Sequence, residues 1–220
     1  MITNFAIKSA QLKKALIELS EKVLLANKTI LLGLETKDYT QFDDAYASLE
    51  NIDEMAQNLD NNVVVALALF HPEAHELRQL VSDLKITYEI TRAASNTKAF
   101  LKNFPTQINY NLDCEAISQY VVPLQTSTLN TLEHAMRMIQ MEERDEANEL
   151  CNKANSEKVK SDEIYAIIEE NIFKKISTYS DRSKEYFALL GSIKKLKKVA
   201  DRAAHIATLM SYAEVGGSIH

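Results

Sequence analysis

The feature that most constrains the fold is a long helical segment that occurs twice. Residues 84–100 have a counterpart in residues 190–207, and each copy closes one half of the chain. A repeated helical unit predicts an all-α protein of two tandem three-helix bundles. The chain contains only four glycines and three prolines in 220 residues, too few for the many tight turns of an all-β domain.

Apolar residues three and four positions apart predict six long helices. The predicted helices cover approximately residues 5–33, 40–70, 72–104, 113–141, 146–178 and 181–210, with a linker at 105–111 and a turn at 142–145. Buried stripes are expected on the first helix, through Leu12, Leu16, Leu19, Val23, Ala26 and Ile30, and on the sixth, through Tyr186, Leu189, Ile193, Leu196, Ala200, Ala203, Ala207 and Met210. The linker predicts one repeat at 1–105 and a second at 106–220.

Composition and motif content argue against several classes of protein. A formal net charge of −6 disfavours nucleic-acid binding, which needs an excess of basic residues to neutralise phosphates. No signal peptide or membrane-spanning run is recognisable, and Cys114 and Cys151 form no CxxC pair, so we expect a reduced, cytoplasmic protein. A nucleophile and base pair, a phosphate-cradling loop and a dinucleotide fingerprint are all missing from the sequence, so no enzymatic activity is expected.

Three segments, at residues 71–86, 162–165 and 199–207, resemble the PhoU family of phosphate-uptake regulators. His71-Pro-Glu-Ala-His-Glu-Leu-Arg78 with Leu84-Lys-Ile86 is similar to the family's Pro-x-Ala-x-Asp-Leu-Arg stretch and following Leu-Lys-Ile. Residues 199–207, Val-Ala-Asp-Arg-Ala-Ala-His-Ile-Ala, resemble its Ile-Ala-Asp-His-Ala-x-Asn-Ile-Ala signature, and Asp162-Glu-Ile-Tyr165 fits its acidic fifth helix. The resemblance implies a homo-oligomer, such as a homodimer, that contacts a phosphate transporter, a sensor histidine kinase or both.

The family's metal-binding positions are altered in this chain. Each half of a family member typically carries a Glu and an Asp four residues apart on its third helix, joined by acids of the second helix. Here the matching residues are Thr91 and Ser95 in the first half, and Lys197 and Asp201 in the second. Neutral hydroxyls cannot supply the negative charge of a metal cluster, so no cofactor is expected. Weak binding of a divalent or iron ion through Asp201, Asp162 and Glu89 is the alternative.

Lys197 admits two interpretations. Its ammonium group could substitute for a metal ion by reaching Asp162 on the neighbouring helix. It could equally form a solvated surface pair with Asp201, one helical turn away. His205, one turn beyond Asp201, either hydrogen-bonds with that carboxylate or lies on the helix surface.

Basic residues are concentrated around Lys197 on the last helix, at Lys194, Lys195, Lys198 and Arg202. Such a run is either a solvated helix face or a patch that meets an acidic partner or the membrane surface, to which the protein would be peripheral at most. We therefore expect a cytoplasmic regulator of phosphate uptake that works by protein contact. The alternatives are a carboxylate metal-binding helical bundle, although the sequence contains no Glu-x-x-His, and a helical scaffold that has lost the phosphate link.

Overall fold

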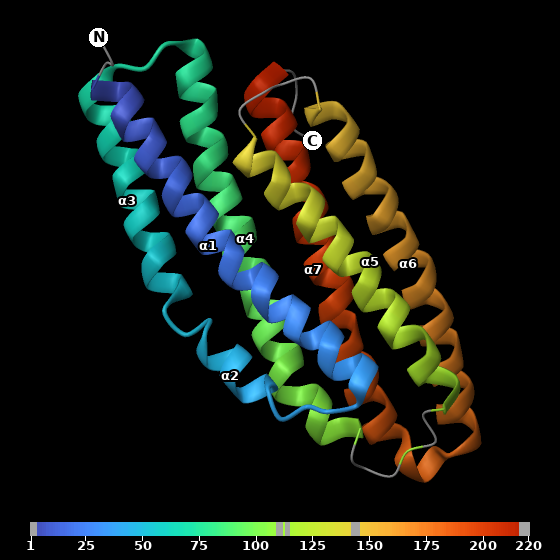
Figure 1. Ribbon diagram of the computed structural model, residues 1–220. Coiled ribbons are helices and arrows are strands. Elements are labelled where there is room, and N and C mark those ends of the chain that lie inside the picture. The colour runs from blue at the N-terminus through green and yellow to red at the C-terminus, as the bar shows by residue number, and fades with distance from the viewer. Residues whose placement is uncertain (1–3, 109–111, 113–114, 142–145, 216–220) are drawn as a thin grey trace.

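The computed structural model describes residues 4–108, 112, 115–141 and 146–215, and these residues form helices and turns without any strand (Figure 1). The first half contains α1 (Asn4–Thr36), a short α2 (Phe42–Ala47), α3 (Ile52–Phe70) and α4 (Ala74–Ile108). The second half contains α5 (Glu115–Gln140), α6 (Ala147–Thr178), a 3-10 turn (Ser180–Arg182) and α7 (Ser183–Val215). The all-α prediction is confirmed.

Helices α4 and α7, which carry residues 84–100 and 190–207, pack against each other along the middle of the molecule (Figure 1). α1 and α3 lie on one side of this pair, α5 and α6 lie on the other, and α1 also contacts α5. Every residue of the two stripes predicted for the first and sixth helices is buried. α1 and α7 are therefore held by apolar burial, the main favourable contribution to folding.

The second predicted helix is in fact two helices. α2 ends at Ala47, and residues 48–51 form a turn before α3 begins at Ile52. Within this turn, Ser48 Oγ donates to the Ala45 carbonyl at 2.7 Å, and the Ile52 amide donates to the Leu49 carbonyl at 3.2 Å. These local bonds pair backbone and side-chain groups within the turn, in place of the bonds that an uninterrupted helix would form.

The fourth helix of the structure, α4, continues through Pro105 to Ile108, beyond its predicted end. Phe104 stacks on Phe100 with ring centroids 4.6 Å apart and meets Tyr39 edge-on at 5.8 Å, so tertiary packing holds the last turn despite the proline. The predicted linker thus begins inside α4. Residues 109–111 and the predicted turn at 142–145 lie outside the described residues, and the division into 1–105 and 106–220 stays a prediction.

A buried polar group joins the two halves near the centre of the molecule. Asn27 of α1 donates to Thr97 Oγ1 of α4 at 3.0 Å, and Gln125 of α5 donates to the Asn27 backbone carbonyl at 2.9 Å. All three residues are fully buried. Hydrogen bonds of this kind fix which helix faces meet, because a shifted packing would leave buried polar atoms unpaired.

None of the helices in the described part of the chain has the combination of length and hydrophobicity needed to span a membrane.

Candidate functional site

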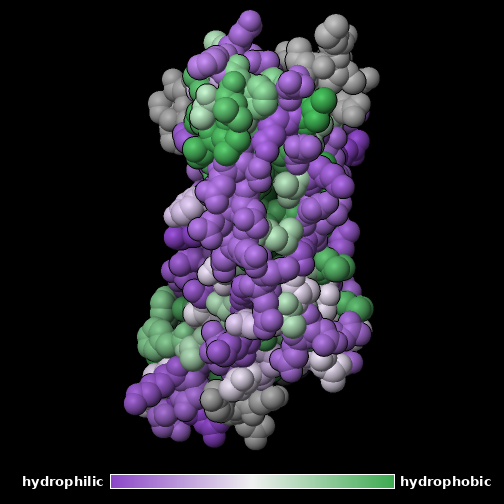
Figure 2. All heavy atoms as spheres, turned by 90° about the vertical axis from the view of Figure 1, so that its left-hand side faces the viewer, coloured by the Kyte–Doolittle hydropathy of each residue, from purple (hydrophilic) through white to green (hydrophobic). Residues whose placement is uncertain are grey.

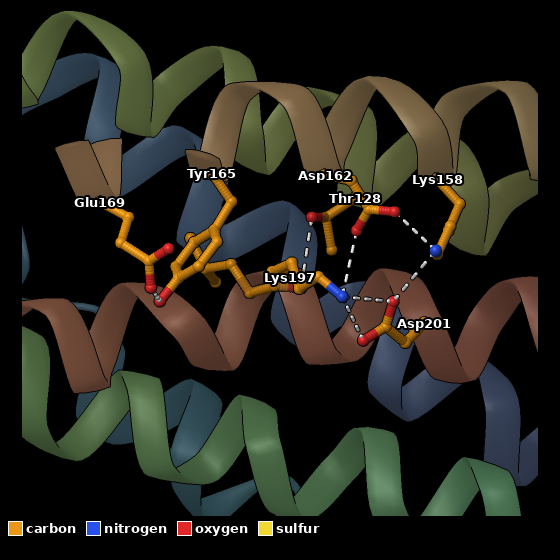
Figure 3. A network of polar contacts seen from close by, with 8 residues as sticks. Thr128, Lys158, Asp162, Tyr165, Glu169, Lys197 and Asp201 are labelled. Atoms are coloured by element: carbon orange, nitrogen blue, oxygen red, sulfur yellow. Dashed lines mark hydrogen bonds and ion pairs between the residues drawn. The ribbon is translucent and has the colours of Figure 1, made fainter. Parts of the chain in front are cut away.

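Four charged side chains from α6 and α7 form a compact network in the second half (Figure 3). Lys197 Nζ lies 2.9 Å from Asp201 Oδ2, on its own helix, and 3.0 Å from Asp162 Oδ1 on α6. Lys158 adds a second ammonium group, 2.5 Å from Asp162 and 3.8 Å from Asp201. Two cations and two anions therefore alternate, and the network has no net charge.

The network is partly withdrawn from solvent, because the Lys197 side chain is only 24% exposed and the Asp201 side chain 27%. Burial alone would raise the pKa of Asp162, but the hydrogen bonds and charges of Lys158 and Lys197 outweigh it and hold that pKa below its ordinary value. Burial likewise opposes the charge of Lys197, yet Asp201 and Asp162 raise the pKa of its ammonium group. Both residues are therefore ionised at neutral pH.

Neighbouring polar groups form hydrogen bonds between α5 and α7 and within α6. Thr128 of α5 is buried, and its hydroxyl lies 2.9 Å from the Leu124 carbonyl of its own helix and 3.3 Å from the Leu196 carbonyl of α7. Tyr165, one turn after Asp162, donates to Glu169 at 3.4 Å (Figure 3). Burial, followed by the charge of Glu169, raises the pKa of Tyr165 to about 12, so this phenol stays protonated.

The third predicted metal-site residue, Glu89, does not join this network. Glu89 lies on α4 and is buried, with its carboxylate 3.2 Å from Arg202 Nη1 and 3.1 Å from His205 Nδ1 on α7. His205 thus meets Glu89, whereas the sequence left open a hydrogen bond with Asp201 or a place on the helix surface. Within the described ranges, no group of three or more His, Cys, Asp and Glu side chains is arranged to hold a metal ion.

The two hydroxyl residues that replace the acids of the first half lie apart from the charged network. Thr91 Oγ1 donates to the Tyr88 carbonyl at 2.7 Å, within α4. Ser95 is exposed and lines a shallow pocket with Asp53 and Lys98, which face each other at 3.9 Å. Thr91 and Ser95 therefore both lie on α4, whereas Asp162 and Asp201 lie on α6 and α7.

The predicted basic patch divides into two parts. Lys194, Lys195 and Lys198 line a groove of about 370 Å³ between α7 and the end of α4, together with Asn103 and Gln107. Arg202 instead turns toward the buried Glu89 carboxylate. We call the three lysines and their groove the basic face. Its lysines have no acidic partner among the residues that the structure describes.

Comparison with known proteins places the fold. No protein-family model matches the chain, and no curated protein matches its sequence. Among solved structures, PhoU from Pseudomonas aeruginosa superposes with a TM-score of 0.86 at 16% identity, covering 97% of this chain and 100% of that one. The chain has the PhoU fold. The phosphate transport system regulatory protein PhoU from Streptococcus pneumoniae gives a TM-score of 0.80 at 18% identity, covering 99% and 100%.

Within this PhoU fold, sequence reasoning identified Lys197, Asp201 and Asp162 but missed Lys158. The available signal was the spacing of Lys158 and Asp162, which are four residues apart and so share a helix face. Glu89 and Arg202 are 113 positions apart, and only the docking of α4 on α7 brings them together. No local pattern could have predicted that pair.

Proposed function

We propose that this protein regulates phosphate uptake and phosphate-responsive signalling by contact, on the cytoplasmic side of the membrane, with a phosphate transporter, a sensor histidine kinase or both. The observation that carries the proposal is the near-complete structural likeness to two PhoU proteins, one of which is described as a regulatory protein of a phosphate transport system. The fold alone would not assign the function, so the surface has to supply the means of contact.

The basic face supplies one contact surface. Lys194, Lys195 and Lys198 present three positive charges on an otherwise acidic protein, and no neighbouring carboxylate in the described part of the chain neutralises them. An acidic surface of a transporter or kinase would meet these charges and be steered toward them.

Exposed apolar residues supply a second contact surface. Val64, Val65 and Leu69, on the last turns of α3, are 56%, 45% and 66% exposed. Figure 2 shows apolar side chains gathered at the end of the face where α3 lies, against a largely hydrophilic surround. Contiguous apolar surface of this kind marks interaction sites, and we infer that a second copy of the chain associates here.

We also infer that the protein acts without a resident metal ion, because Lys197 occupies the position that a cation would take. Asp162 and Asp201 already face two ammonium groups at ion-pair distances, and Glu89 is engaged by Arg202 and His205. A divalent cation needs several oxygen ligands converging on one point. The residues present therefore do not fit a metal ion.

Deletion and complementation test the function. Cells that lack the protein should take up excess phosphate in phosphate-rich medium, and the wild-type chain should restore the normal rate. We expect Lys194→Glu with Lys198→Glu to fail in restoration and in pull-down of the transporter or kinase. The matched control, Lys85→Glu with Lys184→Glu, makes the same charge change on other exposed lysines and should behave as wild type. Normal phosphate uptake after deletion would contradict the proposal.

A further inference from the structure

A cavity lies near the C-terminal end of α7, away from the basic face in the first half of that helix. It has a volume of about 380 Å³ and opens where α1, α4, α5 and α7 meet. It shares no residue with the basic face or the ion-pair network. Its volume is in the range of pockets that bind small molecules.

Just over half of the residues that line the cavity are apolar. Met138 comes from the last turn of α5 and Met141 directly follows that helix, while Met210 comes from α7 and Phe5 and Leu16 from α1. Methionine side chains are flexible and polarisable, so a wall of this kind adapts to ligands of different shape. The cavity therefore favours a ligand with an apolar body.

One carboxylate is buried in the wall. Asp83 of α4 is 4% exposed, and its Oδ1 accepts a hydrogen bond from Gln79 Nε2 at 2.8 Å. Burial raises the pKa of Asp83 to about 6, and the hydrogen bond from Gln79 opposes that rise only in part. At neutral pH the group is therefore mainly ionised, and no cationic side chain among the described residues is paired with it.

The other titratable residues of the cavity are Lys13 of α1, His75 and Glu76 of α4, and Glu214 of α7. Lys13 donates to the Met141 carbonyl at 2.6 Å, and Glu76 accepts from the Glu73 amide at 2.9 Å. A buried carboxylate without a counter-charge is unfavourable, and a cation brought to it inside an apolar wall is bound more strongly than in water.

We propose that this cavity binds a small organic ammonium ion, with the ammonium group against the Asp83 carboxylate and the apolar body against the methionine wall. A divalent metal ion does not fit, because no group of three donor side chains suited to a metal occurs in the described part of the chain. The inference goes beyond the proposed regulatory function and does not depend on it.

Titration of the full-length protein with phenethylammonium chloride at neutral pH tests the site. We expect saturable binding, with shifts of the methyl signals of Met138, Met141 and Met210 in NMR spectra. Asp83→Asn keeps the size of the side chain and should weaken binding about tenfold or more. Phenethyl alcohol, which has the same body without the charge, should bind wild type and variant alike.

Two further variants test whether the amine binds in this cavity. Asp60→Asn removes a carboxylate on α3, outside the cavity, whose pKa is also raised by burial, and it should leave amine binding unchanged. Ser9→Phe places a ring in the cavity and should reduce binding of both phenethyl compounds. The proposal is overturned if the amine does not bind, if it binds equally to wild type and Asp83→Asn, or if Ser9→Phe has no effect.

Discussion

At the scale of single residues, the notable feature is Lys197, whose ammonium group lies between two carboxylates. Lys197 stands at a position where the resemblance implies an acid, and its Nζ lies within 3.0 Å of oxygens from both Asp162 and Asp201. Because the side chains are partly screened from water, this arrangement contributes more than an exposed ion pair. It gives the α6–α7 interface a charge-dependent component of stability.

Replacing Lys197 with Met tests that contribution. We expect a loss of about 1–2 kcal/mol in the free energy of unfolding at neutral pH, since two carboxylates would then share Lys158 alone. Chemical denaturation measures this loss. Lys174→Met is the control, because Lys174 and its partner Glu170 are both 68% exposed, and it should leave the free energy of unfolding nearly unchanged.

The pH dependence of the Lys197→Met effect has a definite sign. The pKa of Asp162 is lowered from 3.8, so its stabilisation is present above that pH and is lost as pH falls. The pKa of Lys197 is raised from 10.5, so its stabilisation is present below that pH and is lost as pH rises further. The difference between wild type and variant should therefore be largest between these limits. A constant difference down to strongly acidic pH would show that the loss comes from packing.

Asp83→Asn should have the opposite effect on stability. Between pH 3.8 and about 6 the folded protein keeps the Asp83 proton that the unfolded chain releases, so wild-type stability falls as pH rises through this window. Above it, the variant should be more stable by about 1–3 kcal/mol, and below pH 3.8 the two should be equal. Denaturation at several pH values, in the absence of amines, measures this. Lys13, His75, Glu76 and Glu214 are the other titratable cavity residues and are common to both proteins.

At the scale of helices, Gly33 and Gly191 both lie in long helices, but replacing them with alanine should have opposite effects on stability. A Cβ atom on Gly33 of α1 would lie 2.5 Å from Phe42 Cε1 and 2.9 Å from the Asp38 carbonyl oxygen. A Cβ atom on Gly191 of α7 would meet nothing within 4 Å. Gly33 is therefore required by the close approach of α2, whereas Gly191 only weakens its helix.

Alanine at each glycine checks this difference. We expect Gly33→Ala to destabilise by about 1–3 kcal/mol, because the Phe42 ring is packed against Tyr39 and Phe100 and has little room to shift. Gly191→Ala should stabilise by about 0.5–1 kcal/mol through helix propensity. Thermal unfolding of both variants measures the two effects. Equal changes would mean that α2 does not pack closely on α1.

Helix location was predictable wherever a buried stripe is continuous. Leu12 to Ile30 on α1 and Tyr186 to Met210 on α7 repeat at helical spacing, and all of these stripe residues are buried. The break at 48–51 and the passage of α4 through Pro105 were not predictable, since the first depends on local hydrogen bonds and the second on Phe104 packing. Propensity is a weak guide where tertiary contacts decide. The burial of Asp83 was not predictable for the same reason, because it depends on the packing of several helices.

At the scale of the whole molecule, the two halves are joined by contacts that neither could make alone. α4 packs along α7, Glu89 of the first half binds Arg202 and His205 of the second, and Gln125 of α5 completes the polar group around Asn27. Separating the halves would expose apolar faces and leave these polar groups unpaired. A chain with such an interface should therefore unfold as one cooperative unit.

The chain contains no tryptophan, so a single introduced tryptophan can report on the unfolding of one half. Tyr46→Trp in α2 and Phe187→Trp in α7 should give the same denaturant midpoint, since the shared interface couples both bundles.

Glu89→Gln should lower the free energy of unfolding by about 1–3 kcal/mol and shift both midpoints equally, because it leaves the Arg202 charge without its carboxylate. Glu133→Gln removes an exposed partner of Lys28 across the same two halves and should shift them by less than about 0.5 kcal/mol. Separate midpoints, or a shift confined to one probe, would show that each half is stable without the other.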